Sequence, residues 1–515
     1  MPLPDSDAPF NSELPLRIGT EEDFAAVSRL FREVGYEEER LCRIFKLSHL
    51  HEFAKIMEAD FSTSSVEPAL LGILIKVFFL VEPVAVQELE ALIPSSAFKA
   101  LWALDLLRPI GEEEGRPSSG PHLCRSTVWL YPSHGLLLVS DRTRQHTDAV
   151  FPALSPLTYR FLQRIGREPA EATLDLCSGC GVAALTLSSH SQRVVAADIS
   201  ERAVHFAGFN CRLNGKPNVV AVASDLYSAF EGQTFQKIVA HPPYVPSLSN
   251  ETIWRDGGET GEMPIRRIVA GLNRFLVPGG RFYASCGGFD TEEASFEERV
   301  RSWLGSAQEE WDVIFALEFD KSPWHLAKEA ANPGPDKQPE RTLRMLQCFH
   351  QLRATEFVTG ALMIHRRLRP VVPPAKPLTR RTQLSPISDG RSFEWWLRYL
   401  SWLEAFESLQ QFSQLKPRVS PHLAIRITHR VQEQELAPVE FLLESSWPFR
   451  TETQVDARIL QTLLKCDGSR TFADLFATAA DLSLLPPGYQ LSDFLQFGLK
   501  MIERGYLTVE ELLPA

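Results

Sequence analysis

Two overlapping patterns in the stretch ATLDLCSGCGVAALTLSS are each typical of a different chemistry. Cys177 and Cys180 form C-x-x-C, the spacing of a redox pair or of half a zinc site. Asp175, Gly179 and Gly181 form D-x-x-x-G-x-G, which joins an apolar run to a helical one. A strand, a glycine-rich turn and a helix start place backbone N–H groups and the positive end of the helix at one point, where a nucleotide can bind. The two patterns therefore predict two different kinds of site.

Two more acids follow at the ends of the next two apolar runs. Asp198 ends VVAAD, about twenty residues beyond the glycines, where a carboxylate can accept hydrogen bonds from both ribose hydroxyls. Asp225 ends the third run in VVAVASD and can accept a hydrogen bond from an adenine amino group. The loop is not G-x-G-x-x-G, because Ala184 stands three residues beyond Gly181, and it lacks the Gly-Lys-Ser/Thr of a P-loop. Acids at three successive strand ends predict a nucleoside site.

The fourth apolar run ends in IVAHPPYVPSL, which places His241, Pro242 and Tyr244 at the same edge. An amide or aromatic amino nitrogen has its lone pair drawn into conjugation, and groups that accept its N–H bonds orient it for in-line attack on a methyl carbon. The side chain at position 241 and the carbonyl after it can supply two acceptors, and Tyr244 can stack on a planar group. A neutral imidazole can equally act as a general base toward a hydroxyl, so the acceptor atom stays open. His241 can also simply fill a turn after the strand.

The elements that must position these residues alternate between strands and helices. The apolar runs ATLDLC, RVVAADIS, NVVAVASD, QKIVAHPP and GGRFYASCGG are separated by helical stretches, which predicts parallel strands covered on both faces by helices. Two further strands are expected at 311–320 and 355–368 and would complete a seven-stranded sheet. The strand ends that carry the acids and His241 then share one edge.

The segments on either side of this sheet are largely helical. Residues 68–141 read as helix, break, helix, turn, helix and two strand-like runs around a GEEEG tip, the order of a winged helix-turn-helix. The third helix, near SSAFKALWALDLL, carries only Lys99 as a base, so a structural or protein-docking role is favoured over contact with nucleic acid. Residues 391–515 begin with a Trp-rich helix and end in apolar helical periodicity, which suggests a second winged helix.

The composition fits a soluble chain of several domains. The 515 residues are 44% hydrophobic and 23% charged, and the net charge of −12 argues against broad affinity for nucleic acid or anionic membrane. The apolar stretch 69–86 contains Lys76, Glu82 and Pro83 and is too broken to span a membrane. The eight cysteines form no dense framework and the start of the chain shows no secretory pattern, so reduced thiols and a cytoplasmic location are expected.

Together the Asp175 loop, the acids that follow and the HPPY tetrapeptide resemble the Rossmann-like S-adenosylmethionine-dependent methyltransferases. Within that class, HPPY followed by RDGGETGEMPIRRIVAGLNRFLVPGGRF is similar to the release-factor glutamine methyltransferases and related small-domain methyltransferases, which have Asn, Asp or Ser where this chain has His241. The resemblance implies that the glycine loop with Asp175 holds the methionine moiety, Asp198 the ribose and Asp225 the adenine edge of S-adenosyl-L-methionine. It also implies that 148–162 lies on the substrate side.

With this resemblance, the α/β fold is expected to be a Rossmann-like methyltransferase core, and the chain is expected to have four parts. These are a helical and winged-helix-like N-terminal domain at 1–142, a methyltransferase domain at 143–368, a Pro/Arg-rich linker at 369–390 and a winged-helix-like C-terminal domain at 391–515. In this setting Cys177 and Cys180 are interpreted as small residues in a cofactor loop, because no second cysteine or histidine pair at zinc spacing lies nearby. No metal site is expected.

Three functions remain open at this point. The first is methyl transfer to a planar amino or amide nitrogen, for example a protein glutamine. The second is methyl transfer to an RNA or DNA base, guided by the terminal modules. The third is a binding protein that keeps the cofactor fold without catalysis and engages a peptide or protein partner through those modules. A protein or nucleic-acid substrate is thus expected, and a membrane is not.

Overall fold

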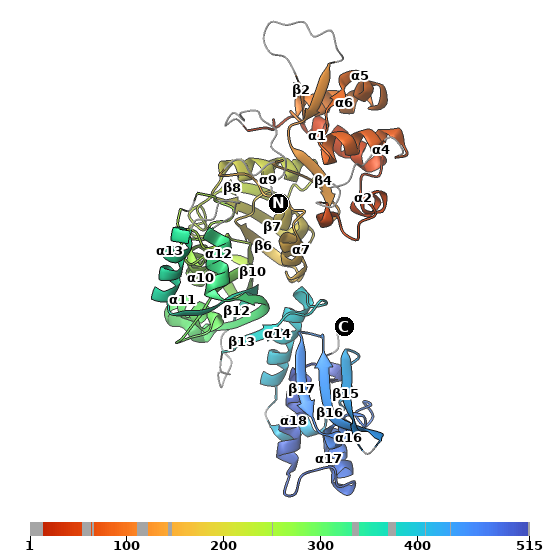
Figure 1. Cartoon of the computed structure of the whole chain (residues 1–515), viewed down its shortest axis with the longest axis vertical. Helices are drawn as coiled ribbons and strands as arrows, with labels where there is room; N and C mark the ends of the chain where they lie inside the picture. Colours follow the sequence, from red (N-terminus) through yellow and green to blue (C-terminus); the bar gives the residue numbers. More distant parts are fainter. Residues whose placement is uncertain are drawn as a thin grey trace.

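The computed structural model describes residues 14–53, 63, 66–110, 122–142, 147–249, 251–331, 339–368, 377–406, 408–432 and 434–512. An α/β core lies between an N-terminal part and a C-terminal part, so the molecule is elongated (Figure 1). The GEEEG tip expected at 111–115 and residues 369–376 of the expected linker lie outside the described residues.

The core is one mixed sheet of eight strands in the order β13-β11-β12-β10-β9-β6-β7-β8. Strands β6 to β10 are parallel to one another, and β12 runs antiparallel to both of its neighbours. The strand bounds are β6 Ala170–Leu176, β7 Ser191–Asp198, β8 Val219–Ala223, β9 Phe235–Ala240, β10 Leu276–Thr291, β11 Trp311–Lys321, β12 Ala354–Arg366 and β13 Thr379–Gln383. The seven predicted strands are therefore present, with β13 added at one edge.

Successive residues of β7 show why helices must cover both faces of the sheet. Val194 and Ala196 pack into one apolar cluster, with α8 and α9, while Val195 and Ala197 pack into the other, with α10 and α11. A strand buried on both faces needs apolar side chains at every position, which is the pattern of RVVAAD. The core helices are α7 Pro156–Gln163, α8 Val182–Leu187, α9 Glu201–Leu213, α10 Met263–Phe275, α11 Phe296–Trp303, α12 Pro323–Ala331 and α13 Pro339–Gln351.

The N-terminal part contains the predicted order of elements. Helix α4 and the π-helical turn η3 are followed by β1, α5, α6, β2 and β3, and β3 pairs antiparallel with both β1 and β2. A winged helix remains a prediction for this part. The bounds are α1 Glu21–Glu33, α2 Glu38–Phe45, η1 Leu50–Glu52, α4 Ala69–Leu74, η3 Ile75–Phe79, β1 Val84–Ala85, α5 Val86–Leu92, α6 Ser95–Ala103, β2 Leu107–Ile110 and β3 Leu123–Ser126.

A hairpin connects the N-terminal part to the core. It consists of β4 Trp129–Ser133 and β5 Leu136–Ser140. Asn210 of α9 and Asn214, which caps the C-terminus of this helix, exchange hydrogen bonds with the backbone of Val139 and Leu137 at 2.7–3.1 Å. Past the hairpin, the carboxylate of Asp141 forms a buried ion pair with Arg202 of α9 and accepts from the backbone N–H of Val150 at 2.7 Å. The chain on either side of residue 142 therefore packs as one unit.

The C-terminal part contains strands that the sequence analysis did not predict. Strands β15, β16 and β17 form an antiparallel sheet before helices α16 to α18, and a winged-helix-like C-terminal domain remains a prediction. Trp395, Trp396 and Tyr399 of α14 are buried, as expected for a Trp-rich amphipathic helix. The bounds are α14 Gly390–Glu404, α15 Leu409–Ser413, β14 Arg418–Val419, β15 Leu423–Gln432, β16 Glu435–Ser445, β17 Thr451–Val455, α16 Ala457–Leu463, α17 Phe472–Asp481, α18 Leu491–Glu503, β18 Leu507–Thr508 and η6 Glu510–Leu512.

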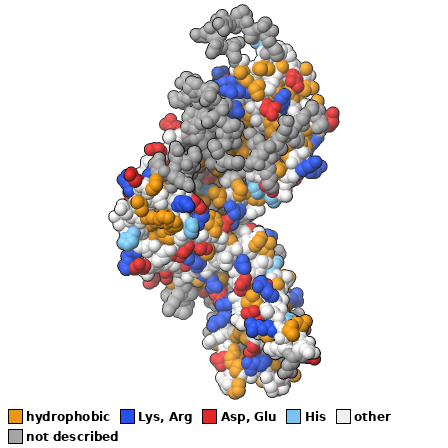
Figure 2. Space-filling model, in the orientation of Figure 1, with side chains coloured by type: hydrophobic (Ala, Val, Ile, Leu, Met, Phe, Trp, Pro, Cys, Tyr) orange, Lys and Arg blue, Asp and Glu red, His pale blue; other side chains and the backbone are white. Residues whose placement is uncertain are grey.

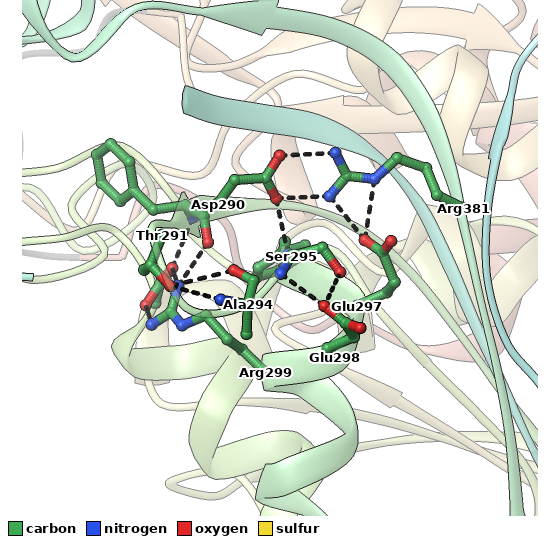
Figure 3. Close-up of polar contacts among 11 residues, drawn as sticks. Asp290, Thr291, Ala294, Ser295, Glu297, Glu298, Arg299 and Arg381 are labelled. Atoms are coloured by element: carbon green, nitrogen blue, oxygen red, sulfur yellow. Dashed lines mark hydrogen bonds and ion pairs between the residues drawn. The ribbon is translucent and has the colours of Figure 1, made fainter. Parts of the chain in front are cut away.

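The second half of the predicted linker at 369–390 contains a strand. Thr379–Gln383 is β13, which pairs in parallel with β11. The Arg381 guanidinium lies between Asp290 at the end of β10 and Glu297 of α11, with N–O distances of 2.5–2.9 Å (Figure 3). Arg380 stacks on Trp396, with 4.3 Å from the guanidinium carbon to the ring centroid, and pairs with Glu503. These two arginines are structural ion-pair partners.

Replacing Arg381 by glutamine is expected to lower the free energy of unfolding by about 1–3 kcal/mol. The substitution leaves the partly buried carboxylates of Asp290 and Glu297 without their counter-charge, which destabilises the fold. Because the arginine is itself incompletely buried, the decrease in the free energy of unfolding is limited. Arg391→Gln is the matched control, because Arg391 is exposed and its pair with Asp389 should contribute less than about 1 kcal/mol. Urea unfolding of both variants measures the decrease in the free energy of unfolding. Equal decreases in the two variants would contradict the stabilising role of the Arg381 ion pairs.

Candidate functional site

A cavity of about 480 Å³ opens at the carboxyl edge of the parallel strands. Its walls come from the loops after four of these strands, from α10, and from the segment that leads into α7. Of the eight residues predicted from the sequence, seven line it: Asp175, Gly179, Asp198, Asp225, His241, Pro242 and Tyr244. Gly181 lies directly behind the lining, at the start of α8.

The glycine loop turns sharply from β6 into α8. Cys177, Gly179 and Gly181 all have positive φ, at 57°, 54° and 80°. A Cβ on Gly181 would lie 3.0 Å from that of Ala207 on α9, so a side chain there would meet both strain and a close contact. A Cβ on Gly179 would meet no atom within 4 Å, because this residue faces the open cavity. The loop therefore leaves room for a ligand at Gly179 and is tightly packed at Gly181.

Asp198 fixes the same loop from the end of β7. One carboxylate oxygen accepts from the backbone N–H of Gly179 at 2.9 Å, and the other accepts from that of Ser200 at 3.0 Å. Each oxygen retains a free lone pair for a ligand hydroxyl. Desolvation raises the pKa of Asp198, while its backbone hydrogen bonds act in the opposite direction. This carboxylate is thus both a support of the loop and an acceptor at the cavity wall.

Asp175 lies deeper, at the end of β6. Its side chain is buried, and one oxygen accepts from the backbone N–H of Ala184 in α8 at 3.1 Å. Burial raises its pKa to about 8, so an unliganded site holds a proton on this carboxyl near neutrality. A cationic ligand group would favour the ionised form.

Asp225 is placed differently from the other two acids. Its side chain is exposed at the rim, and both oxygens accept from the guanidinium of Arg267 on α10, at 2.8 and 3.1 Å. Arg267 also lines the cavity, and the sequence analysis did not identify it. The pair joins a strand end to a helix 42 residues further along the chain, a separation that gives no local sequence signal.

The tetrapeptide after β9 also lines the cavity. The His241 ring lies between Phe161 of α7 and Tyr244, at centroid distances of 5.1 and 6.3 Å. Burial, followed by the nearby charge of Arg164, lowers the pKa of His241 to about 4, so the ring is neutral at pH 7. Among the described residues, no hydrogen bond to this ring is found. Its nitrogens are therefore available to a ligand.

The DGG-rich segment after the tetrapeptide holds Tyr244 in place. Val245 and Asp256 form a parallel bridge, in which Val245 accepts from Gly257 at 2.9 Å and donates to Arg255 at 3.1 Å. Gly261 has φ of 78°, and a Cβ there would lie 2.3 Å from the carbonyl oxygen of Tyr244. Glycines are needed at positions 257 and 261 because the segment folds back directly against the tetrapeptide.

The two cysteines of the loop have the character of structural thiols. Cys180 is buried and Cys177 is half-buried, and all eight cysteines of the chain are free. Burial raises the pKa of Cys180 to about 12 and that of Cys177 well above its usual value. A redox-active cysteine needs the opposite shift. In the described residues, no group of three or more His, Cys, Asp or Glu side chains has the arrangement of a metal site.

Two further groups in the cavity were not predicted. The Ser178 hydroxyl is buried and has no hydrogen-bond partner among the described residues, although it lines the cavity beside Gly179. Phe151 and Trp254 lie against each other, at 5.3 Å between ring centroids, and give the outer wall an aromatic surface. The buried Asp175 carboxyl, the unpaired Ser178 and the open Gly179 fit a polar cationic cofactor such as S-adenosylmethionine.

The sheet order and the site at its carboxyl edge define a Rossmann-like methyltransferase fold. Residues 155–298 match the family model of the methyltransferase small domain. The match spans the glycine loop, all three acids and the tetrapeptide.

The particular relatives are glutamine methyltransferases. The release factor glutamine methyltransferase of Thermodesulfovibrio yellowstonii is 29% identical over 140 residues, which cover 24% of this chain and 50% of that protein. The ribosomal protein uL3 glutamine methyltransferase of Neisseria meningitidis is 30% identical over 145 residues, which cover 25% and 48%. The chain thus spans about half the length of the curated relatives it matches.

Two solved structures are among those that are similar to part of this chain. The T. thermophilus 16S rRNA N2 G1207 methyltransferase, in complex with AdoMet and guanosine, is 14% identical, with 56% of this chain and 64% of that chain covered at a TM-score of 0.27. The ribosomal protein L11 methylase of Lactobacillus delbrueckii subsp. bulgaricus is 17% identical, with 41% and 77% covered at a TM-score of 0.24.

Asp175→Asn is expected to stabilise the cofactor-free protein at pH 8 while weakening cofactor binding. A carboxyl with a raised folded-state pKa favours folding while protonated, so its stabilisation is lost as pH rises from about 4 towards 8. The amide has no proton to lose and still accepts from Ala184. Thermal unfolding at pH 5, 6.5 and 8 should show a shallower decline for the variant than for the wild type. Parallel declines would contradict this interpretation of Asp175.

Proposed function

We propose that the protein transfers a methyl group from S-adenosylmethionine to a planar amide or amino nitrogen, such as that of a protein glutamine. The observation that carries this proposal is that the HPPY tetrapeptide and the glycine loop line one cavity, at the ends of the neighbouring strands β9 and β6. The names of the relatives, which act on a release factor and on ribosomal protein uL3, support glutamine as the acceptor.

The cofactor side follows from the acids and the loop. In this proposal Asp198 accepts from the ribose hydroxyls, and Asp175 with the loop at Gly179 and Gly181 holds the methionine moiety. Asp225 accepts from the adenine amino group at the rim, where Arg267 already shares its two oxygens. The bound cofactor supplies an electrophilic methyl on a sulfonium. Every other task falls to side-chain and backbone groups of the chain.

The acceptor side follows from the tetrapeptide. His241 is neutral and accepts one N–H of the acceptor nitrogen, and the Pro242 carbonyl accepts the other. Pro242 and Pro243 limit the motion of that carbonyl, because their φ angles are fixed. Tyr244 stacks on the plane of the amide. The aromatic wall of Phe151 and Trp254 excludes water, which strengthens both hydrogen bonds.

The surface gives no sign of a nucleic-acid substrate on the face shown in Figure 2. Lys and Arg side chains are interspersed with Asp and Glu there, instead of forming one basic field. Helix α6, the predicted third helix of the N-terminal module, has Lys99 as its one basic residue. A protein substrate, and a protein contact through the terminal modules, are therefore part of this proposal.

A cytoplasmic location is proposed with the same substrate. The eight free cysteines support a reducing compartment. No helix among the described residues is long and apolar enough to cross a membrane.

The test is methyl transfer from radiolabelled S-adenosylmethionine into cell extract separated into protein, RNA and DNA. Label in protein that digests to methylglutamine, and that is lost with Tyr244→Ala, is the expected result. Label in RNA or DNA would replace the proposal with base methylation. Cofactor binding with no label in any fraction would indicate a binding protein.

A further inference from the structure

A second cavity, of about 830 Å³, lies where the N-terminal part meets the core. Its walls come from α1, from the start of α2, from the tip of the β4–β5 hairpin, from α7 and from the end of α9. Tyr159 of α7 lines this cavity, whereas Leu157, Thr158 and Phe161 of the same helix line the cofactor cavity. The site therefore stands next to the methyltransferase site but is built from different residues.

Three rings gather on one wall of this second cavity. Tyr159 lies 4.6 Å from His134 and 5.9 Å from His49, measured between ring centroids. His134 is at the hairpin tip and has φ of 54°, a backbone conformation that a residue other than glycine seldom adopts. Of these rings, the face of Tyr159 can attract an organic cation within about 6 Å.

A half-buried carboxylate lies beside the rings. One oxygen of Glu38 accepts from the backbone N–H of His134 at 3.0 Å, which fixes the side chain and leaves the other oxygen for a ligand. Nδ1 of His134 is hydrogen-bonded to the Ser133 hydroxyl at 2.8 Å. Its Nε2 is buried without a hydrogen-bond partner among the described residues. Burial lowers the pKa of His134 to about 4, so this ring is neutral and does not repel a cation.

The other charged side chains of the lining also favour a positively charged ligand. Glu37 and Glu39 flank Glu38, which makes three carboxylates against the two bases Arg32 and Lys216. Arg32 is exposed and is screened by water, whereas Lys216 is half-buried like Glu38, so the lining keeps an excess of one carboxylate over the bases.

We propose that this cavity binds an organic cation, an ammonium or guanidinium group on an aliphatic chain. The cationic head donates to Glu38 and lies against the ring of Tyr159, beside the neutral ring of His134. Such a cationic group can belong to a free small amine or to the basic side chain of a polypeptide. Binding here does not depend on methyl transfer.

The experiment is calorimetric titration of the full chain with cadaverine, agmatine, the peptide acetyl-Gly-Arg-Gly-amide and neutral 1,5-pentanediol. We expect the cations to bind and the diol not to bind. Glu38→Gln should weaken cation binding about tenfold, the effect of losing a charge-assisted hydrogen bond, while its amide oxygen can still accept from His134. Glu33→Gln, which removes an exposed carboxylate of α1 outside the cavity lining, is the matched control and should bind as the wild type does.

The other titrations distinguish the two sources of the cation, a free amine and a polypeptide side chain, and they define the results that would contradict the proposal. Binding of the peptide alone assigns the site to a polypeptide side chain, and equal binding of the diamine and the peptide assigns it to the cationic head itself. Tyr159→Leu should also weaken binding, independently of the charge. The proposal is overturned if the cations do not bind at about 20 mM, if the diol binds equally well, or if Glu38→Gln retains wild-type affinity.

Discussion

Replacing His241 by alanine is expected to lower methyl transfer by about 100-fold or more and to leave the affinity for S-adenosylmethionine nearly unchanged. The ring lies on the acceptor side of the cavity, between Phe161 and Tyr244, and makes no described contact with the glycine loop or with Asp198. Its removal takes away an acceptor for one N–H of the substrate without disturbing the cofactor wall. Single-turnover methyl transfer and calorimetric cofactor binding separate the two effects.

His241→Asn is the matched variant for this prediction. An amide oxygen can accept the same N–H, so the asparagine variant should keep activity within about tenfold of the wild type if hydrogen bonding to an amide is the role of the residue. If His241 is instead a base toward a hydroxyl, asparagine should be as inactive as alanine, because an amide cannot take up a proton. Equal activity of all three proteins would contradict any role in the transfer.

The pH dependence of His241 has a definite sign. Its pKa is lowered to about 4, so the ring is neutral above that value and protonated below it. An imidazolium is a donor at both nitrogens and cannot accept from the substrate. Methyl transfer should therefore stay level between about pH 5 and 7 and fall below about pH 4, whereas the asparagine variant should lack this fall.

The candidate site could be predicted from sequence because its residues follow apolar strands at a common sheet edge. Asp198 and His241 each end such a run, and a parallel sheet brings these ends together whatever the intervening helices are. Arg267 gave no such signal. It stands on a helix face, and its role depends on Asp225, which only the folded chain brings within hydrogen-bond distance.

The fold was least predictable where strands lack apolar alternation. Thr379–Gln383 reads as a basic stretch after prolines, and it is a strand because β11 pairs with it and because Asp290 and Glu297 neutralise Arg381. None of these partners is near in sequence. By contrast, LAIRITHRV in β15 does alternate at Ile425 and Ile427, so a period-two signal was present before the structure was known.

Asp198→Ala is expected to weaken S-adenosylmethionine binding by about 1–3 kcal/mol, the cost of unmaking charge-assisted hydrogen bonds. The structure gives this residue two tasks, because its oxygens already hold the backbone N–H groups of Gly179 and Ser200 while facing the cavity. Alanine removes the acceptor for the ribose and also the support of the loop. Calorimetry of the two proteins at the same pH measures the change.

The matched control is Asp225→Ala, at the exposed rim. Its carboxylate is engaged by Arg267 and supports no backbone N–H of the glycine loop, so its loss should weaken binding by less than about 1 kcal/mol. An isosteric variant, Asp198→Asn, separates the tasks of Asp198, because the amide oxygen can still accept from one backbone N–H. We expect it to lie between the alanine variant and the wild type. Unchanged affinity in Asp198→Ala, or a larger loss in Asp225→Ala, would place the nucleoside elsewhere on the sheet edge.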